Sequence, residues 1–460
     1  MSPRTPKWPA LKEGLRAFSW VAIKMLQDLV RKGTTIPVHS ETVPVRRGKN
    51  QWSSETKEFP LFGVLLMKLD KNLKALPEYQ GCESIFLKEH EIALHMNQLV
   101  GTPHQSTFLS VERTLHAILL DQLNGDSLEF LEDRFDQTYE KVEEYFSSKI
   151  ERFIGWVPLK NFSSDLDEII IDPTLSIRRL PDAVIADFYG YGGSSSFGGT
   201  NEVLRWTHGI YVEYELPKIF GGVVESAGKS LEPLQARIDR PVEDVVRSLR
   251  LIKCGVVGIG PKLMKPQTWS PDTGTLLSYG YPDVPFRAPY TLVQGDVASL
   301  LSLLPVVKAL DRKGFSFLEL ALRRFDQSYG RVGVEDQLID YMIAFEALYL
   351  NDAGAQERGE MRFRLALRVA QFLRELNQRK SLYREMRTAY DMRSSIVHGD
   401  VYDPPKVDGV VIPVEEYISR IENYLRESLI KFLRLAQEPN PKKKLVSWED
   451  LLFPHVPNNG

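Results

Sequence analysis

The most constraining feature of this sequence is a change of character near residue 290. From there to about residue 438, apolar side chains recur every three or four residues with only short breaks. This periodicity predicts a run of helices, and the short linkers favour antiparallel neighbours in a helical bundle. The predicted helices are Asp296–Leu310, Phe315–Tyr329, Val334–Leu350, Glu357–Leu376, Ser381–Val397 and Val414–Gln437.

The chain before residue 290 has a mixed pattern. Helical periodicity covers Leu11–Arg31, a stretch from Asp126 or Ser127 to Ile150, and a stretch with Pro241 in its first turn. Short β-branched and aromatic runs, separated by Pro, Gly and Ser, predict strands. The strand-like runs are Phe62–Met67, Phe108–Val111, Glu168–Ile171, Ala183–Tyr189 and Ile210–Leu216. The predicted fold class is α+β, with a mixed α/β N-terminal region followed by an all-α helical bundle.

A segment rich in Gly and Pro, residues 260–289, separates the two patterns, and 460 residues are more than one hydrophobic core usually serves. We therefore expect a mixed region over residues 1–290, in which a further boundary near residue 155 is left open. The bundle is expected over residues 291–438, and residues 439–460 are expected to form a C-terminal extension.

Composition narrows the class of protein. A net charge of −3 argues against a protein that coats polyanions over its whole surface. Cys82 and Cys254 are far apart in sequence, so neither a disulfide framework nor a thiolate zinc site is indicated. The longest apolar stretch, Val297–Leu310, is too short to span a bilayer and contains Pro305 and Lys308. These features predict a cytoplasmic protein without a membrane segment.

Two other motifs do not indicate a site. The Gly-rich stretch Gly190–Gly199 contains no Lys, and no helix is predicted after it, so we interpret it as a strand connection and not as a phosphate-binding loop. His90 and His95 are five residues apart, whereas ligands on one helical face need spacings of three or four. We expect no metal and no cofactor.

The remaining candidate is the pair Arg393 and His398 near the end of a predicted helix. Five helical residues advance about 7.5 Å and turn about 140°, so a regular helix would separate the two side chains. Gly399 is a natural left-handed C-terminal residue. We therefore expect the last turn to tighten or unwind so that Arg393 reaches towards His398. The negative end of the helix dipole favours a protonated imidazole there, which suits proton transfer near neutral pH.

Positive charge also gathers around this pair. Residues 356–400 contain ten cations and six acids, a net charge of +4. Solvated helix surfaces explain such charge equally well, but a phosphate-bearing ligand would be attracted to it. The expected RNA contacts are Arg362, Arg368 and Arg387.

Three motifs in this half resemble the ApeA-like branch of the HEPN superfamily. They are LIDYMIAFEALYL over Leu338–Leu350, RLALRVA over Arg364–Ala370, and YDMRSSIVHG over Tyr390–Gly399. The resemblance covers residues 315–437 and extends more loosely to Trp156–Asp187. It implies that the helical part is a HEPN bundle.

The resemblance also implies a metal-independent endoribonuclease, acting as a toxin or in antiphage abortive defence. Arg393 and His398 are then the catalytic pair, in a site made composite by dimerisation of two bundles. Ser394 stands where many members have Asn, Asp or His. The 2′-OH of RNA supplies the nucleophile, so a His for proton transfer and an Arg for the developing charge suffice.

Further roles follow as expectations from the same resemblance. Glu346 and Tyr390 are candidates for orienting Arg393, and a buried ion pair that only keeps the bundle in register is the equal alternative for Glu346. The RNA substrate is expected to be a single-stranded loop such as those of tRNA, with a phage-derived trigger at the N-terminal region. The alternative is a non-catalytic HEPN protein that binds RNA or a nucleotide.

Overall fold

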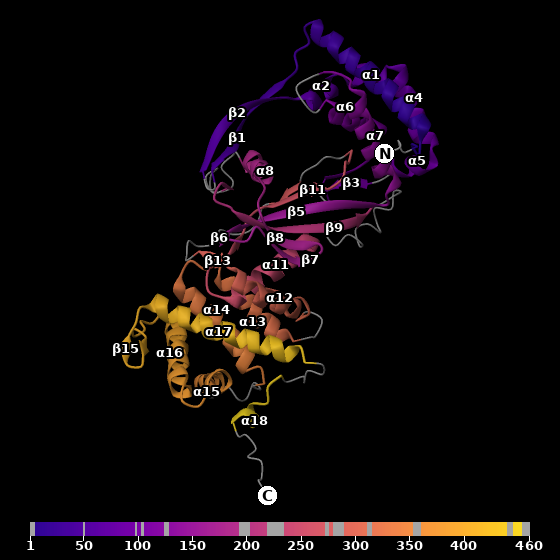
Figure 1. The fold of residues 1–460 in the computed structure, drawn as a ribbon. Coiled ribbons are helices and arrows are strands. Elements are labelled where there is room, and N and C mark those ends of the chain that lie inside the picture. Colours follow the sequence, from indigo (N-terminus) through magenta and orange to yellow (C-terminus); the bar gives the residue numbers. More distant parts are fainter. Residues whose placement is uncertain are drawn as a thin grey trace. The chain divides into compact units, whose positions relative to one another are not determined.

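The computed structural model describes residues 5–48, 51–96, 99–102, 105–123, 128–192, 203–218, 234–271, 276–278, 289–310, 315–352, 360–438 and 445–452. The chain forms two compact units. The first contains Met1–Pro158, Glu168–Asp239 and Gly260–Gly280, and the second contains Leu159–Asp167, Arg240–Ile259 and Tyr281–Gly460. Helices and several separate sheets make up the described residues, which confirms the α+β fold class (Figure 1).

The first unit begins with a helical layer around its own hydrophobic core. On the first helix, Leu11, Leu15, Phe18, Ala22 and Leu26 recur at helical spacing and are all fully buried. They pack with apolar side chains of the later helices. The helices of this layer are α1 (Pro9–Arg31), α2 (Phe62–Lys68), α3 (Asp70–Lys74), α4 (Pro77–Lys88), α5 (His90–His95), α6 (Val111–Gln122) and α7 (Glu132–Ser147).

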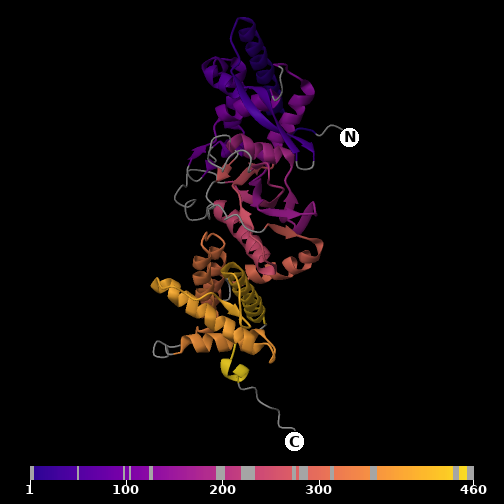
Figure 2. The same cartoon turned by 90° about the vertical axis from the view of Figure 1, so that its left-hand side faces the viewer.

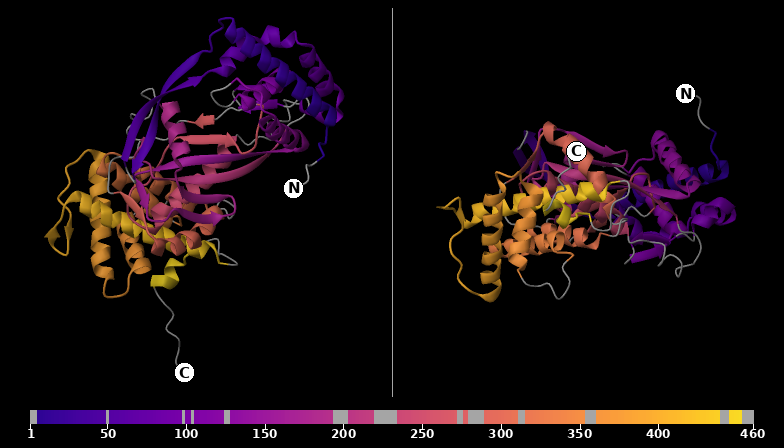
Figure 3. Two further views of the ribbon diagram at one scale, coloured as in Figure 1. Left: turned by 45° about the horizontal axis from the view of Figure 1, so that its top comes forward. Right: turned by 90° about the horizontal axis from the view of Figure 1, so that it is seen from below.

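Two antiparallel hairpins accompany this layer. The long one joins β1 (Val38–Gly48) to β2 (Gln51–Pro60) and is the pair of indigo strands in the left view of Figure 3. It reaches α8 (Asp182–Gly192), where Arg46 donates to Asp182 at 2.6 Å. The short hairpin joins β3 (Leu99–Thr102) to β4 (Gln105–Phe108).

An antiparallel sheet follows in the order β12-β11-β5-β9-β8-β7. Its central pair is formed by β5 and β9, which are joined along almost their whole length. The strands are β5 (Ile150–Lys160), β7 (Glu168–Asp172), β8 (Leu175–Arg179), β9 (His208–Pro217), β11 (Lys262–Pro266) and β12 (Leu276–Ser278); β10 (Gly258–Ile259) pairs with the end of β5. The strands predicted over Glu168–Ile171 and Ile210–Leu216 are confirmed.

Two other predicted strands are wrong. Phe62–Met67 forms α2, which buries Phe62, Leu65 and Leu66, and Ala183–Tyr189 lies in α8. Short apolar runs do not distinguish a strand from a buried helix by periodicity alone. Of the run Phe108–Val111, only Phe108 belongs to a strand, because α6 starts at Val111.

Three predicted boundaries also need correction or lie outside the described residues. The helix expected from Asp126 or Ser127 begins at Glu132, and residues 124–127 are not described. Pro241 lies inside α11 (Leu234–Ile252) and not in its first turn. The Gly-rich stretch is described only as far as residue 192, the end of α8.

The second unit is a helical bundle with several short strands, β10 among them. All six predicted helices are present, with ends shifted by a few residues; Glu357, the expected start of the fourth, lies outside the described residues. They are α12 (Gln294–Lys308), α13 (Ser316–Ser328), α14 (Val334–Tyr349), α15 (Met361–Leu373), α16 (Arg379–His398) and α17 (Val414–Ala436), followed by α18 (Trp448–Leu452). Parallel strands β6 (Phe162–Ser164) and β13 (Tyr290–Leu292) pair, as do antiparallel β14 (Lys406–Val407) and β15 (Val410–Val411). Figure 2 gives a second view of these helices, coloured from orange to yellow.

Helix α14 is the centre of this bundle and packs against α13, α15, α16 and α17. Most of its side chains are buried, which is typical of a helix enclosed on all sides. Its Asp340 carboxylate, 2% exposed, accepts from Arg324 at 3.1 Å and from Arg331 at 2.8 Å. The two guanidinium groups offset the cost of burying this charge.

Helix α16 ends in a defined C-terminal motif. Gly399 has a positive φ of 76°, and its N–H donates to the Ile396 carbonyl at 3.2 Å. The N–H of Asp400 donates to the Ser395 carbonyl at 2.8 Å. These are the two hydrogen bonds of a Schellman motif, and they confirm the predicted left-handed glycine.

In the described part of the chain, no helix combines the length and the apolar character that crossing a bilayer requires.

Replacing Gly399 with Ala should destabilise the second unit. No atom lies within 4 Å of the added Cβ, so the cost comes from the left-handed backbone alone. That cost is about 1 kcal/mol, which corresponds to a melting temperature lower by roughly 2–4 °C. The control is Gly295→Ala in α12, where the added Cβ also meets open space but φ is not positive; it should leave the melting temperature unchanged or higher. An equal fall in melting temperature in both variants would contradict this prediction.

Candidate functional site

The end of α16 presents its two candidate catalytic residues to different surroundings. Arg393 is half-buried and faces α14, whereas His398, the last residue of the helix, is exposed. The helix stays α-helical through both positions, so the backbone does not unwind as expected. Within the described part of one chain, no hydrogen bond or ion pair joins Arg393 to His398. The helical geometry therefore separates the pair.

Arg393 lies beside Glu346 of α14 without making a short hydrogen bond. Its Nη2 is 3.9 Å from Glu346 Oε1, and the two side chains are only 26% and 25% exposed. Arg393 Nε and Glu346 Oε1 are both enclosed and have no hydrogen-bond partner among the described residues. Burial raises the pKa of Glu346, and the Arg393 charge opposes that rise. Within the described residues, the Nε donor of Arg393 and the Oε1 acceptor of Glu346 are therefore both without a hydrogen bond, although both are enclosed.

Tyr390 completes this cluster, one helical turn before Arg393. Burial raises the pKa of its hydroxyl, the Glu346 charge raises it further, and Arg393 opposes both effects. The structure therefore brings together Glu346, Tyr390 and Arg393, as expected for residues that orient the arginine. Ser394 is half-buried, and its hydroxyl makes no hydrogen bond with the residues the structure describes.

The three arginines expected to contact RNA lie in different environments. Arg362 donates to Asp391 at 2.6 Å in an exposed pair, and Arg387 lies 5.7 Å from the Tyr383 ring centroid. The side chains of Arg362 and Arg387 therefore remain accessible to solvent, whereas the side chain of Arg368 is buried.

Arg368 is a structural residue, which corrects the expectation that it binds RNA. Its side chain is 9% exposed and makes two bonds to Asp352, at 2.7 and 3.0 Å. It also donates to the Tyr349 carbonyl at 2.6 Å and stacks 5.0 Å from the Trp448 ring centroid. Burial alone would raise the pKa of Asp352, but the Arg368 hydrogen bonds and charge lower it. These contacts join α15 to the end of α14 and to α18.

Nothing in the described residues forms a group of three His, Cys, Asp or Glu side chains that could hold a metal ion.

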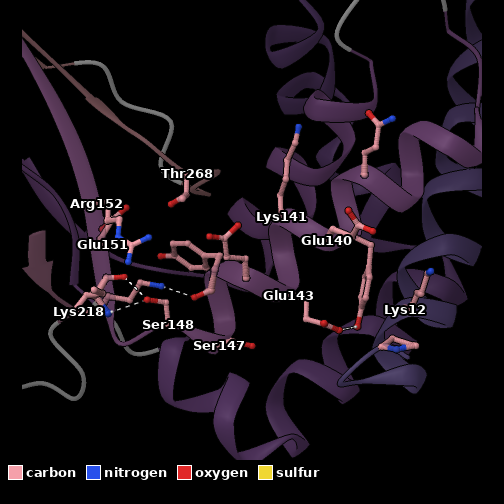
Figure 4. A pocket seen from close by; sticks show the side chains of 16 residues that line it. Lys12, Glu140, Lys141, Glu143, Ser147, Ser148, Glu151, Arg152, Lys218 and Thr268 are labelled. Carbon is pink, nitrogen blue, oxygen red and sulfur yellow. Dashed lines mark hydrogen bonds between the residues drawn. The ribbon is translucent and has the colours of Figure 1, made fainter. Parts of the chain in front are cut away.

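A second candidate site, which sequence reasoning missed, lies in the first unit. A cavity of about 930 Å³ is lined by side chains from α1, α7, β5 and the end of β9. In Figure 4, Glu140 and Lys141 come from α7, and Glu151 and Arg152 come from β5. Four acidic and four basic side chains line it, so the cavity favours neither anions nor cations by net charge.

Lys218 is the unusual group in this cavity. Its side chain is nearly buried, its Nζ donates to the Tyr145 carbonyl at 2.6 Å, and it lies 3.4 Å from the centroid of the Tyr145 ring. Burial lowers the pKa of Lys218 to about 8. No sequence signal indicates this, because Lys218 simply follows the end of a strand and its environment comes from α7.

Comparisons of this chain with models of protein families, with curated proteins and with solved structures found no match.

Replacing Arg393 with Gln should raise the pKa of Glu346 further. The guanidinium charge lowers this pKa, and within the described residues its removal leaves the effect of burial unopposed. A ¹³C NMR titration of the Glu346 carboxyl carbon measures the change. Arg384→Gln, at an exposed position of the same helix, is the control and should leave the pKa in place. An unchanged Glu346 pKa in Arg393→Gln would show that the two groups do not interact.

Lys218→Met should stabilise the protein more at pH 7 than at pH 9.5. Folded Lys218 loses its proton near pH 8, whereas a lysine in the unfolded chain keeps it to about pH 10.4. The unfolded state therefore binds more protons in this window, so wild-type stability rises with pH as the buried charge disappears. The measurement is the difference in melting temperature between variant and wild type at each pH. For Lys141→Met, a half-exposed lysine of the same cavity, this difference should not change with pH.

Proposed function

We propose that this protein is a metal-independent endoribonuclease of the HEPN type, with Arg393 and His398 as its catalytic residues. The observation that carries the proposal is the placement of two side chains near the end of α16. There an exposed imidazole stands at the negative end of a helix, and an arginine with an unpaired Nε lies one and a half turns earlier. The motif resemblance over residues 315–437 supports the same assignment.

The chemistry requires few protein groups. The 2′-OH of RNA attacks the adjacent phosphorus, the bond to the 5′ oxygen breaks, and the products carry a 2′,3′-cyclic phosphate and a 5′-OH. His398 takes the proton from the 2′-OH or gives one to the leaving oxygen. Arg393 stabilises the additional negative charge on the phosphorane oxygens. Glu346 and Tyr390 hold the guanidinium in place.

A second copy of the chain completes the site in this proposal. In this proposal a single bundle does not present both groups to one phosphate, because Arg393 lies beside Glu346 of α14 whereas His398 is exposed in the last turn of α16. Val397 is 51% exposed and Val401 is 98% exposed, on either side of His398 in sequence. A second bundle packed against this end of α16 would bury these two apolar side chains. We therefore propose a homodimer through the bundles.

The surface around the site supports RNA as the substrate. Arg387 is accessible on α16, and Arg362 of α15 lies beside the same helix in an exposed ion pair with Asp391. Such side chains bind the phosphate backbone without regard to sequence. We further propose, as the resemblance implies, that the protein acts in antiphage defence or as a toxin, with tRNA loops as substrate and a phage-derived trigger at the N-terminal region. The composition favours action in the cytoplasm.

One observation favours a second candidate function. Arg393 and His398 do not contact each other in the described part of one chain, and Ser394 makes no hydrogen bond there. The alternative proposal is that the same surface holds RNA or a nucleotide without cleaving it. This non-catalytic binding protein keeps the positive surface and needs no composite site. The two candidates differ in whether RNA is cut.

Purified full-length protein should cleave total RNA in the presence of EDTA and leave 2′,3′-cyclic phosphate ends. Arg393→Ala and His398→Ala should each lower the rate by at least about 10²-fold, the range usual for a lost proton-transfer group. Arg384→Ala, exposed on the same helix, is the matched control and should keep most of the activity. Cleavage that survives either catalytic substitution, or that EDTA abolishes, would contradict the proposed mechanism. Tight RNA binding without cleavage would select the second candidate.

A further inference from the structure

A second cavity, separate from the end of α16, lies within the second unit. Its volume is about 520 Å³, inside the usual range of small-molecule pockets. One wall is a face of α11, where Glu243, Val246, Arg247 and Arg250 recur at helical spacing. The remaining lining comes from β10, from the last turns of α13 and from the residues up to Arg331.

The cavity is rich in arginine. Arg247, Arg250, Arg323 and Arg331 line it, against two carboxylates, Glu243 and Asp326. Burial raises the pKa of Glu243, and neighbouring Asp326 adds to that rise although Arg247 opposes it. The lining carries a net positive charge.

Two of the arginines are held in position before any ligand arrives. Asp326 accepts from Arg247 Nε at 2.6 Å and from Arg250 Nη1 at 3.4 Å, so one carboxylate is shared by two guanidinium groups. Arg250 also donates to the Val257 carbonyl at 3.0 Å and stacks 4.4 Å from the buried Tyr329 ring centroid. Fixed guanidinium groups lose little conformational entropy when they bind an anion.

Some guanidinium N–H groups of this cavity make no hydrogen bond with the described residues. Arg250 Nε is enclosed and has no hydrogen-bond partner in the part of the chain that the structure describes. Arg323 is exposed, and it makes no hydrogen bond or ion pair with the residues that the structure describes. Arg331 pairs with Asp340 through Nε. A phosphate group, with several acceptor oxygens and up to two negative charges, matches this excess of donors.

We propose that this cavity binds a phosphorylated small molecule of nucleotide size, with its phosphates on Arg247, Arg250 and Arg323. Val246 and Ile259 supply an apolar part of the lining for the remainder of the ligand. An RNA chain is a poorer match, because the site is a cavity of limited volume and not an extended groove. The inference does not depend on the proposed nuclease activity.

Isothermal titration of the full-length protein with ATP, ADP, AMP, pyrophosphate and adenosine tests the proposal. We expect saturable binding of at least one phosphorylated probe at one per chain, weakening as salt rises, and no binding of adenosine. Arg323→Gln should weaken this binding at least about tenfold. Because Arg323 is exposed and unpaired among the described residues, the variant should fold normally.

The control is Arg384→Gln, an equally exposed arginine on α16 outside the cavity, which should bind the same probe as wild type does. Equal weakening in both variants would mean that general surface charge attracts the probe, and the site would be wrong. Absence of saturable binding for every phosphorylated probe at millimolar concentration would also overturn the proposal. So would Arg323-dependent binding of a short RNA oligonucleotide but of no small molecule.

Discussion

The second unit depends on the burial of α14 on all sides. A helix in that position places most of the polar side chains beyond its first turn in an environment where an unpaired charge is costly. Asp340 meets this constraint with two arginines at hydrogen-bonding distance. Glu346 meets it only partly, because its nearest cation, Arg393, stays 3.9 Å away and burial raises the pKa of the carboxyl. The cluster of incompletely paired groups on α14 and α16 is where the candidate catalytic arginine lies.

The same helix geometry that places Arg393 against α14 directs His398 away from it. A regular α16, ended by the Schellman motif at Gly399, leaves the imidazole exposed at the last turn. One bundle therefore offers a half-buried guanidinium beside α14 and an exposed imidazole at the end of α16. This is why the proposed reaction calls for two copies and why the exposed Val397 and Val401 are relevant to it.

The arginine side chains discussed here have three different roles in the second unit. The burial and the ion pairing of each side chain decide which role it has. Arg368 is enclosed by Asp352 and the Trp448 ring and stabilises the packing of helices. Arg387 is accessible and suits a flexible polyanion. Arg247 and Arg250 line a cavity and share one carboxylate, a fixed arrangement that suits a small phosphorylated ligand.

Local patterns in the sequence predicted much of this molecule. Helical periodicity located all six helices of the bundle, and Gly399 marked the end of α16, because both signals involve residues within one or two turns of each other. The proximity of Glu346 and Tyr390 to Arg393 was also anticipated, from the motif resemblance. The strand predictions for Phe62–Met67 and Ala183–Tyr189 failed because short apolar runs fit either type of element until a neighbouring surface buries one face.

What the tertiary structure decided is the environment of each charged side chain. The sequence contains no sign that Arg368 is buried, that Asp326 is shared by two arginines of α11, or that Lys218 lies against Tyr145. Each of these depends on residues 16 to 79 positions away in the chain. Periodicity and caps are short-range properties of the chain, whereas burial, pairing and pKa depend on which distant segments the fold brings together.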